Sequence, residues 1–366
     1  MGKQEEELVT IHINGKPRQI TRAAYRRTRR WERRRAFRRA LHVPFEWLGI
    51  GLGWLIFTNL PHRALIGLCD WLSAILYTFD KRGRNRSLQN LRLVRGARPL
   101  DRTFDPDRAP YNPTHAERLI IRRAYRNMAR TIGHIFWTCR AAKKRAAAVG
   151  EMAPRGKEFL AANKPAVTVS AHLGCWEILS QLAYLEGHSM LSVAKRIGTG
   201  GMTKMLMWAR KSIGQEIVPA DGAFRSLLAG IKSGKSLGLL VDQAVNPRDG
   251  GIWIRFFGEP LPVSAAPAFF AAKANAPIVV AWSRPVGCGH YRCEILDVIP
   301  ASAARDIWGV TQRCATDLEH IIRRHPSCWV LNYNFFRHDP TPDDLKTLEA
   351  REAKAKSAAT EKGNTL

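Results

Sequence analysis

The fold follows most directly from residues 167–185, VTVSAHLGCWEILSQLAYL. A β-branched run opens this stretch and predicts a buried strand, and the later apolar residues recur at helical spacing. Gly174 lies between the two and permits a tight turn. His172 therefore follows the carboxyl end of a strand, which is where open α/β sheets bind their ligands.

Short apolar runs alternate with helical segments along the chain beyond this unit. Helices are predicted near residues 203–213 and 224–232. Strands that alternate with helices of this length predict an α/β fold, in which helices cover the faces of a sheet. The other predicted strands are SMLSVAK (189–195), GQEIVPA (214–220), SLGLLVD (236–242), APIVVAWS (276–283) and YRCEILDVI (291–299).

Three segments outside this alternation also have a distinct pattern. Residues 115–145 carry apolar side chains at helical spacing, which predicts one amphipathic helix. The preceding RPLDRTFDPDRAPYNPT (98–114) predicts a loop. The final stretch, 351–366, is rich in Ala, Lys and Glu and predicts a frayed or flexible tail.

Charge is the most unusual property of this 366-residue chain, whose length suits about two domains. It has 58 Lys and Arg against 31 Asp and Glu, a net charge of +27. Residues 1–42 carry 13 basic and 4 acidic side chains, while residues 341–366 carry five of each sign. The body between them therefore holds a net charge of +18 and should attract polyanions: nucleic acid, an anionic membrane or an acidic protein.

The cysteines and the N-terminus limit the cellular setting. Seven cysteines without a CxxC pair argue against a disulfide framework or a zinc ribbon and fit a reducing compartment. The polar start, MGKQEEELVT, lacks the apolar region of a signal peptide, so we expect a protein that is not secreted.

Two apolar stretches near the N-terminus point to a membrane surface. Ten arginines between Arg22 and Arg39 precede an apolar run at 47–57, and a second run at 64–79 is interrupted by Asp70. Each run is shorter than the roughly 20 apolar residues of a spanning helix. Their tryptophans suit helices that lie at the membrane interface, with the arginines near anionic headgroups. A buried helical hairpin is the alternative, and the arginines could equally form a solvated helix or arm.

His172 and Glu177 form the strongest candidate for catalysis. Glu177 lies five residues after His172, in the first turn of the predicted helix, where its carboxylate can return to the imidazole. A carboxylate bonded to one ring nitrogen leaves the other nitrogen free to act as a general base. The alternative is a lone surface histidine with a glutamate that complements the helix dipole.

Six motifs in order resemble the bacterial lipid A acyltransferases, the lauroyl and myristoyl transferases, within the glycerolipid acyltransferase superfamily. HLGCWE (172–177) has the HxxxxE form of that superfamily. The similarity extends over roughly residues 45–337. The other similar blocks are RSLQNLRLV (86–94), WARKSIG (208–214), LLVDQAVNP (239–247), the FFG segment that starts at Arg255, and HPSCWVLNYNFFR (325–337).

The resemblance implies an αβα acyltransferase core with a mixed sheet, preceded by membrane-associated helices. It implies transfer of an acyl chain from acyl carrier protein to a hydroxyl group of a membrane glycolipid similar to a lipid A precursor. The alternative is acyl transfer to another lipid, such as a lysophospholipid or aminolipid. A more remote alternative, supported by the charge of +27 and the arginine arm, is a nucleic-acid-binding protein. No cofactor or metal is implied. The expected location is the cytoplasmic face of the inner membrane, against an anionic surface, and no nucleic-acid partner is expected.

The resemblance also implies roles for residues and segments. His172 and Glu177 would be catalytic, the first as general base and the second as its partner. Substrate contacts would come from Arg196, Arg210, Asp242, Gln243, Phe257 and Gly258. The implied segments are an arginine-rich extension (1–42), apolar membrane-associating helices (43–80), the acyltransferase domain (81–340) and a charged flexible tail (341–366).

Some features compete with this interpretation. Cys175 stands where the family often has Asn, and a thiolate beside an imidazole could act as a nucleophile. The segment around 256–270 could line an acyl channel or pack in the core. GIKSGKS (230–236) is one residue short of a phosphate-binding loop. His134 and His188 are interpreted as structural.

Overall fold

The computed structural model describes residues 8–13, 16–21, 47–97, 99–162, 165–194, 200–219 and 222–363. It divides into two compact units, Met1–Ile56 and Phe57–Leu366. The smaller unit contains an antiparallel hairpin, β1 (Leu8–Ile13) with β2 (Lys16–Thr21), and the first part of a helix described over 47–59. The predicted arginine-rich arm, Arg22 to Arg39, lies outside the described residues.

The larger unit is built on a seven-stranded mixed sheet in the order β3-β11-β10-β4-β7-β5-β6. Neighbouring strands are parallel, except that β10 and β11 are antiparallel. The predicted α/β fold is therefore confirmed. The strands are β3 (Gly150–Met152), β4 (Val167–Ser170), β5 (Met190–Ala194), β6 (Glu216–Pro219), β7 (Ser236–Leu240), β10 (Ile278–Gly287) and β11 (His290–Ile299).

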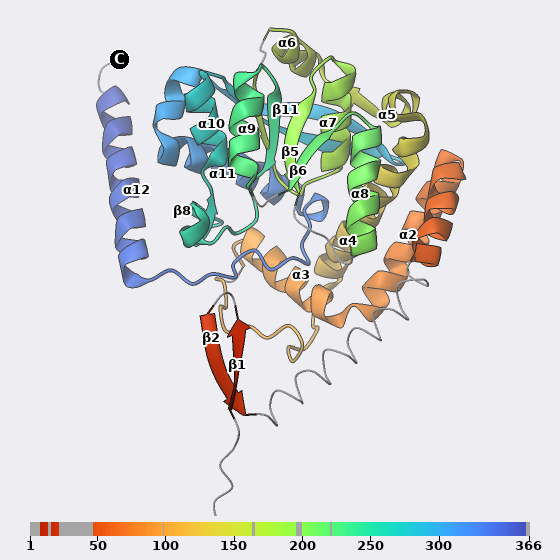
Figure 1. The fold of residues 1–366 in the computed structure, drawn as a ribbon, viewed down its shortest axis with the longest axis horizontal. Coiled ribbons are helices and arrows are strands. Elements are labelled where there is room, and N and C mark those ends of the chain that lie inside the picture. Colours follow the sequence, from red (N-terminus) through yellow and green to blue (C-terminus); the bar gives the residue numbers. More distant parts are fainter. Residues whose placement is uncertain are drawn as a thin grey trace, which may run out of the picture. The chain divides into compact units, whose positions relative to one another are not determined.

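Helices cover both faces of this sheet, and Figure 1 shows α9 and α10 on one side of the strands and α7 on the other. The β10 side chains show the division, because Val280 and Trp282 join one apolar core and Val279 and Ala281 the other. The helices of the larger unit are α2 (His62–Phe79), α3 (Lys81–Val94), α4 (His115–Thr138), α5 (Ala142–Val149), α6 (Pro154–Ala162), α7 (Trp176–Leu185), α8 (Gly200–Ser212), α9 (Ala223–Lys232), α10 (Ala266–Ala274), α11 (Ile307–Arg324) and α12 (Pro342–Gly363).

All six strands predicted from apolar runs are present in the sheet, within a few residues of their expected ends. The helix predicted over 115–145 is instead two helices, since α4 ends at Thr138 and a short 3-10 turn separates it from α5. Thr114 caps α4, because its hydroxyl accepts the N–H of Glu117 while the Glu117 carboxylate accepts the N–H of Thr114.

The C-terminal stretch differs from the predicted flexible tail, because α12 is helical from Pro342 to Gly363. Leu348 is buried, and Glu352 forms an ion pair of 3.1 Å with Arg255 of β8 (Gly251–Phe256). A composition of Ala, Lys and Glu suits a helix as well as a solvated tail. The buried Leu348 and the ion pair of Glu352 both help to attach the helix to the sheet domain.

The two apolar stretches near the N-terminus form the helix at 47–59 and α2. In the described part of the chain, no helix combines the length and apolar character needed to cross a membrane. One face of α2 is buried and includes Leu65 and Cys69. Elsewhere on its surface the helix exposes Trp71, Leu76 and Phe79.

Candidate active site

The register of two central strands brings together residues that are 70 positions apart. In the parallel pair β4 and β7, Ser170 lies opposite Leu240, and each strand ends at that residue. Two residues further along come His172 and Asp242. Because parallel strands keep their register, this common offset sets the two side chains next to each other at the carboxyl edge of the sheet.

The imidazole of His172 is held by the Asp242 carboxylate. Its Nδ1 lies 2.8 Å from Oδ1, and the backbone N–H of His172 donates to Oδ2 at 3.0 Å. An ionised carboxylate only accepts hydrogen bonds, so Nδ1 carries the proton and Nε2 of the neutral ring keeps its lone pair. The His172 side chain is 23% exposed, so part of the ring is open to a substrate.

Asp242 is completely buried, and three donors satisfy its oxygens. Besides the two from His172, the indole N–H of Trp329 donates to Oδ2 at 2.9 Å. Burial alone would raise the pKa of Asp242. The attraction of the His172 ring in its protonated form, and the hydrogen bonds from His172 and Trp329, outweigh burial, so the pKa lies below its ordinary value and the carboxylate stays ionised.

The free nitrogen of His172 has two neighbours. The amide nitrogen of Gln243 lies 3.4 Å from Nε2, at the long limit of a hydrogen bond. The Trp176 ring packs edge-on to the imidazole, with centroids 5.1 Å apart. Gln243 therefore borders the atom that would accept a proton.

Trp329 lies in a segment that is linked to the His172 turn by backbone hydrogen bonds. The N–H of Val330 donates to the His172 carbonyl at 3.2 Å, and the N–H of Gly174 donates to the Cys328 carbonyl at 2.8 Å. The Trp329 indole also stacks on Phe335, with centroids 4.1 Å apart. These contacts fix the indole against Asp242.

Glu177 does not return to the imidazole, so this prediction of its position is wrong. Its carboxylate faces α8 instead, where Arg210 donates through Nε to Oε2 at 3.1 Å and through Nη2 to Oε1. Only 4% of the Glu177 side chain and 14% of the Arg210 side chain are exposed. Buried charges require partners, and these two residues satisfy each other.

The same ion pair changes the interpretation of Arg210. The sequence predicts a substrate contact for its guanidinium, but the edge formed by Nε and Nη2 faces Glu177. The pair raises the pKa of Arg210 against the effect of burial. Arg196, the other candidate, lies outside the described residues, and its substrate contact stays a prediction.

Phe257 and Gly258 form the turn of a β-hairpin between β8 and β9 (Glu259–Ser264). Their φ values are +54° and +84°, which suits a two-residue turn with both residues in the left-handed region. The Phe257 ring is buried, and its centroid lies 5.5 Å from that of Trp329. Phe256 and Phe270 are core residues. Of the two interpretations of the segment around 256–270, an acyl channel or core packing, the structure favours core packing.

Cys175 is fully buried at the start of α7. Burial raises the pKa of its thiol to about 12, so a thiolate is scarce at neutral pH. The cysteine-nucleophile alternative is therefore disfavoured. Across the described residues, no set of three or more His, Cys, Asp or Glu side chains is grouped to hold a metal ion.

Sequence reasoning missed the part played by Trp329. Its block was singled out only for similarity, yet the indole completes the donors around Asp242. A buried carboxylate needs hydrogen-bond donors, so the sequence could have predicted that Asp242 has further donors. It could not have predicted which side chain supplies them.

Comparison with known proteins gives the class of enzyme first. The chain is 24% identical over 176 residues to the phosphatidylinositol mannoside acyltransferases of Mycobacterium tuberculosis strains CDC 1551 / Oshkosh and ATCC 25618 / H37Rv. Each match covers 46% of this chain and 54% of the relative, so the chain spans about half the length of these relatives. These relatives are acyltransferases, enzymes that transfer acyl groups.

The family description "Bacterial lipid A biosynthesis acyltransferase" matches residues 33–337 of this chain. That range contains the sheet, His172, Asp242 and Trp329. The chain belongs to this family.

Proposed function

We propose that the protein transfers a fatty acyl chain from a thioester to a hydroxyl group of a membrane glycolipid, with His172 as general base and Asp242 as the residue that orients it. The observation that carries this proposal is the 2.8 Å contact between His172 Nδ1 and Asp242 Oδ1 at the carboxyl edge of the sheet. It leaves Nε2 as the proton acceptor, bordered by the amide of Gln243.

The proposed reaction is a direct transfer. Nε2 of His172 takes the proton of the acceptor hydroxyl while its oxygen attacks the thioester carbonyl carbon, and the C–O bond forms. The tetrahedral intermediate collapses as the C–S bond breaks, and the leaving sulfur takes the proton from the imidazolium. Ionised Asp242 stabilises the imidazolium between these steps. The products are an ester and a free thiol.

Acyl carrier protein is the donor that we propose. The body of the chain carries a net charge of +18 outside its two ends, and carrier proteins of this kind are acidic. The same charge supports a location against an anionic membrane on the cytoplasmic side. The exposed side chains of Trp71, Leu76 and Phe79 on α2 supply apolar surface for that contact.

Two classes of acceptor deserve direct comparison. The family description favours a lipid A precursor. The names of the two mycobacterial relatives favour a glycosylated phosphatidylinositol, because they act on phosphatidylinositol mannosides. Both are glycolipids with an ionic headgroup, and both present sugar hydroxyl groups to the same base.

The test is an acyl-transfer assay on the purified full-length protein. Acyl carrier protein thioesters and coenzyme A thioesters are each incubated with lipid A precursors, phosphatidylinositol mannosides and lysophospholipids, and the products are identified by mass spectrometry. We expect transfer from the carrier-protein thioester to a glycolipid. His172→Ala should lower turnover at least about 10²-fold, as loss of a general base does. A variant that keeps a tenth of the wild-type rate would contradict the role of His172.

A further inference from the structure

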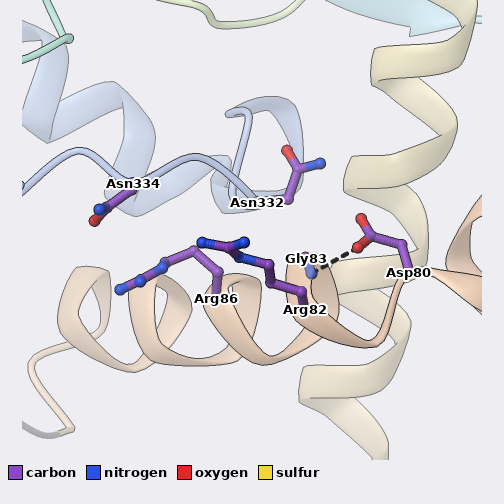
Figure 2. Close-up of a pocket in the computed structure, with 6 residues that line it drawn as sticks. All are labelled: Asp80, Arg82, Gly83, Arg86, Asn332 and Asn334. Carbon is purple, nitrogen blue, oxygen red and sulfur yellow. Dashed lines mark hydrogen bonds between the residues drawn. The ribbon is translucent and has the colours of Figure 1, made fainter. Parts of the chain in front are cut away.

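A small polar cavity of about 170 Å³ lies between α3 and the segment that follows Trp329 (Figure 2). Pockets for drug-sized ligands usually measure about 300–1,000 Å³, so this one suits a single ionic group of a larger substrate. Its lining residues are Asp80, Arg82, Gly83, Arg86, Asn332 and Asn334.

Donors dominate the lining. Figure 2 shows the Arg82 guanidinium extending from α3 toward the segment that carries Asn332 and Asn334, while the Arg86 side chain runs along the helix at the edge of the cavity. A guanidinium offers several N–H donors in a fork that matches phosphate oxygens, and each Asn amide offers two more. Four residues with donor side chains, from two elements, therefore line one cavity.

The one carboxylate in the lining is already satisfied. Asp80 Oδ1 accepts the N–H of Gly83 at 2.7 Å, and Oδ2 accepts the hydroxyl of Tyr125 at 2.8 Å. Arg84, which lies on the same helical turn, donates to the carbonyls of Tyr77 and Thr78 and does not line the cavity.

The two lining arginines are only weakly neutralised. Among the described residues Arg82 pairs with Asp107 at 3.8 Å, and both side chains are largely exposed. Within the described part of the chain, Arg86 donates to the neutral amide of Gln89 and forms no ion pair. Burial, and then the charge of Arg82, lower the pKa of Arg86, so an anion in the cavity would relieve an unfavourable accumulation of positive charge.

The cavity is rigidly connected to His172. Asn90, one helical turn after Arg86, donates to the carbonyls of Leu331 and Tyr333 at 2.7 and 2.9 Å, which fixes the backbone on both sides of Asn332. Val330 in the same segment is hydrogen-bonded to the His172 carbonyl at 3.2 Å. Two residues span at most about 7 Å, so Asn332 begins within that distance of Val330.

We propose that this cavity binds a phosphate ester group of a substrate whose reacting end lies at His172. The proposal rests on the proposed function for the identity of that substrate. Two substrates carry the required chemistry: an acyl donor whose thioester arm ends in a phosphate, and an acceptor with a phospholipid headgroup. Both would be anchored by the same two guanidinium groups.

The test measures binding by titration calorimetry or ligand-observed NMR on the full-length protein. Two matched pairs of probes distinguish the sources: 4′-phosphopantetheine against pantetheine, and glycerophosphoinositol against inositol. The cavity variant is Arg82→Gln/Arg86→Gln. The control is Arg95→Gln/Arg123→Gln, which removes the same charge from exposed positions that do not line the cavity.

We expect the wild type to bind the phosphorylated member of at least one pair more tightly than its phosphate-free partner. The cavity variant should weaken that binding about tenfold or more, since hydrogen bonds to charged groups of this kind contribute at least one factor of ten. The control should keep it. The pair that shows the preference identifies the source as donor or acceptor.

Two results would overturn the proposal: no preference for phosphate in the wild type, or equal weakening in the cavity variant and the control. Binding does not require turnover, so the outcomes stay separate from those of the transfer assay. A wild type that prefers phosphate but transfers no acyl group contradicts only the proposed function. A wild-type protein that transfers acyl groups but shows no preference for the phosphorylated probes contradicts only the assignment of the cavity.

Discussion

His172 has Asp242 as its hydrogen-bonded carboxylate, and this determines what the imidazole can do. We expect Asp242→Asn to lower turnover by about 10²- to 10⁴-fold, because the amide no longer fixes the proton on Nδ1 or stabilises the imidazolium. The measurement is kcat for acyl transfer, with circular dichroism to verify that the variant is folded.

Glu177→Gln is the matched control for Asp242→Asn. It removes a carboxylate that pairs with Arg210, so its main effect should be on stability. Loss of one partner from a buried ion pair costs about 3 kcal/mol in the free energy of unfolding. If Glu177→Gln abolished turnover while Asp242→Asn kept most of it, Glu177 would be the partner of His172 after all.

The buried histidine His134 gives the protein a pH-dependent stability. His134 Nδ1 lies 2.7 Å from the carbonyl of Arg130, and its Nε2 lies 3.1 Å from Nε2 of His62. Burial lowers the pKa of His134 to about 3, with His62, Arg130 and His290 adding to the effect. The His134 ring is therefore neutral in the folded protein. In the unfolded chain it takes up a proton near its ordinary pKa of about 6.5, and this protonation favours unfolding.

The sign of the pH effect follows from that difference. Above about pH 6.5 the histidine is neutral in both states, and below it the unfolded chain binds the extra proton. The free energy of unfolding should fall by about 1.4 kcal/mol for each pH unit on the way toward pH 3. Denaturant titrations should show a flatter dependence for His134→Asn, whereas the exposed His320→Asn should keep the wild-type slope.

The turn between β4 and α7 depends on one glycine. Gly174 has a φ of +62°, and a Cβ at this position would lie 1.8 Å from the Ser283 carbonyl oxygen of β10. We expect Gly174→Ala to cost more than about 3 kcal/mol in the free energy of unfolding or to prevent folding, because backbone must move to relieve the clash.

Gly96 provides a matched comparison for Gly174. Its φ is +65°, but nothing lies within 4 Å of the position of its Cβ. Gly96→Ala should therefore cost only the strain of the left-handed conformation, about 1 kcal/mol. Thermal unfolding of both variants separates the two effects, and equal losses would show that the contact with Ser283 is unimportant.

The strands of the sheet were predictable because their signal is local. A run such as Val167–Ser170 is apolar and β-branched and is bounded by Pro165 on one side and a turn on the other. The same local signal set His172 at the end of a strand. The helix α3 was not predicted, since its sequence is polar and its buried residues include Asn85 and Asn90, which bond to loop backbone.

The partner of His172 was not predictable from spacing. Glu177 is near in sequence, and Asp242 becomes a neighbour only through the pairing of β4 with β7. Sequence periodicity identifies strands but does not say which strands pair or in what register. Once the register is known, His172 and Asp242 follow at the same offset, and a buried carboxylate then requires the donor that Trp329 provides.

Charge and exposed apolar surface act together in the chain as a whole. The helix α3 has five basic side chains and no acidic one in 14 residues, and it begins two residues after the end of α2. α2 itself exposes Trp71 and Phe79, with exposed fractions of 61% and 81%. Exposed apolar rings followed at once by a basic helix suit an anionic bilayer, since the rings enter the interface and the net positive charge of α3 attracts the headgroups.

Binding to vesicles should therefore have two components. Flotation with phosphatidylglycerol vesicles should weaken at 1 M salt, where the Debye length is about 3 Å, without being lost, because burial of apolar rings is not screened. Trp71→Ser/Phe79→Ser should remove the salt-resistant part, whereas Val286→Ser, an exposed apolar position on β10, should not. Deletion of residues 1–40 removes a charge of +9 and should reduce the salt-sensitive part. A wild-type protein that stays unbound at low salt would contradict membrane attachment.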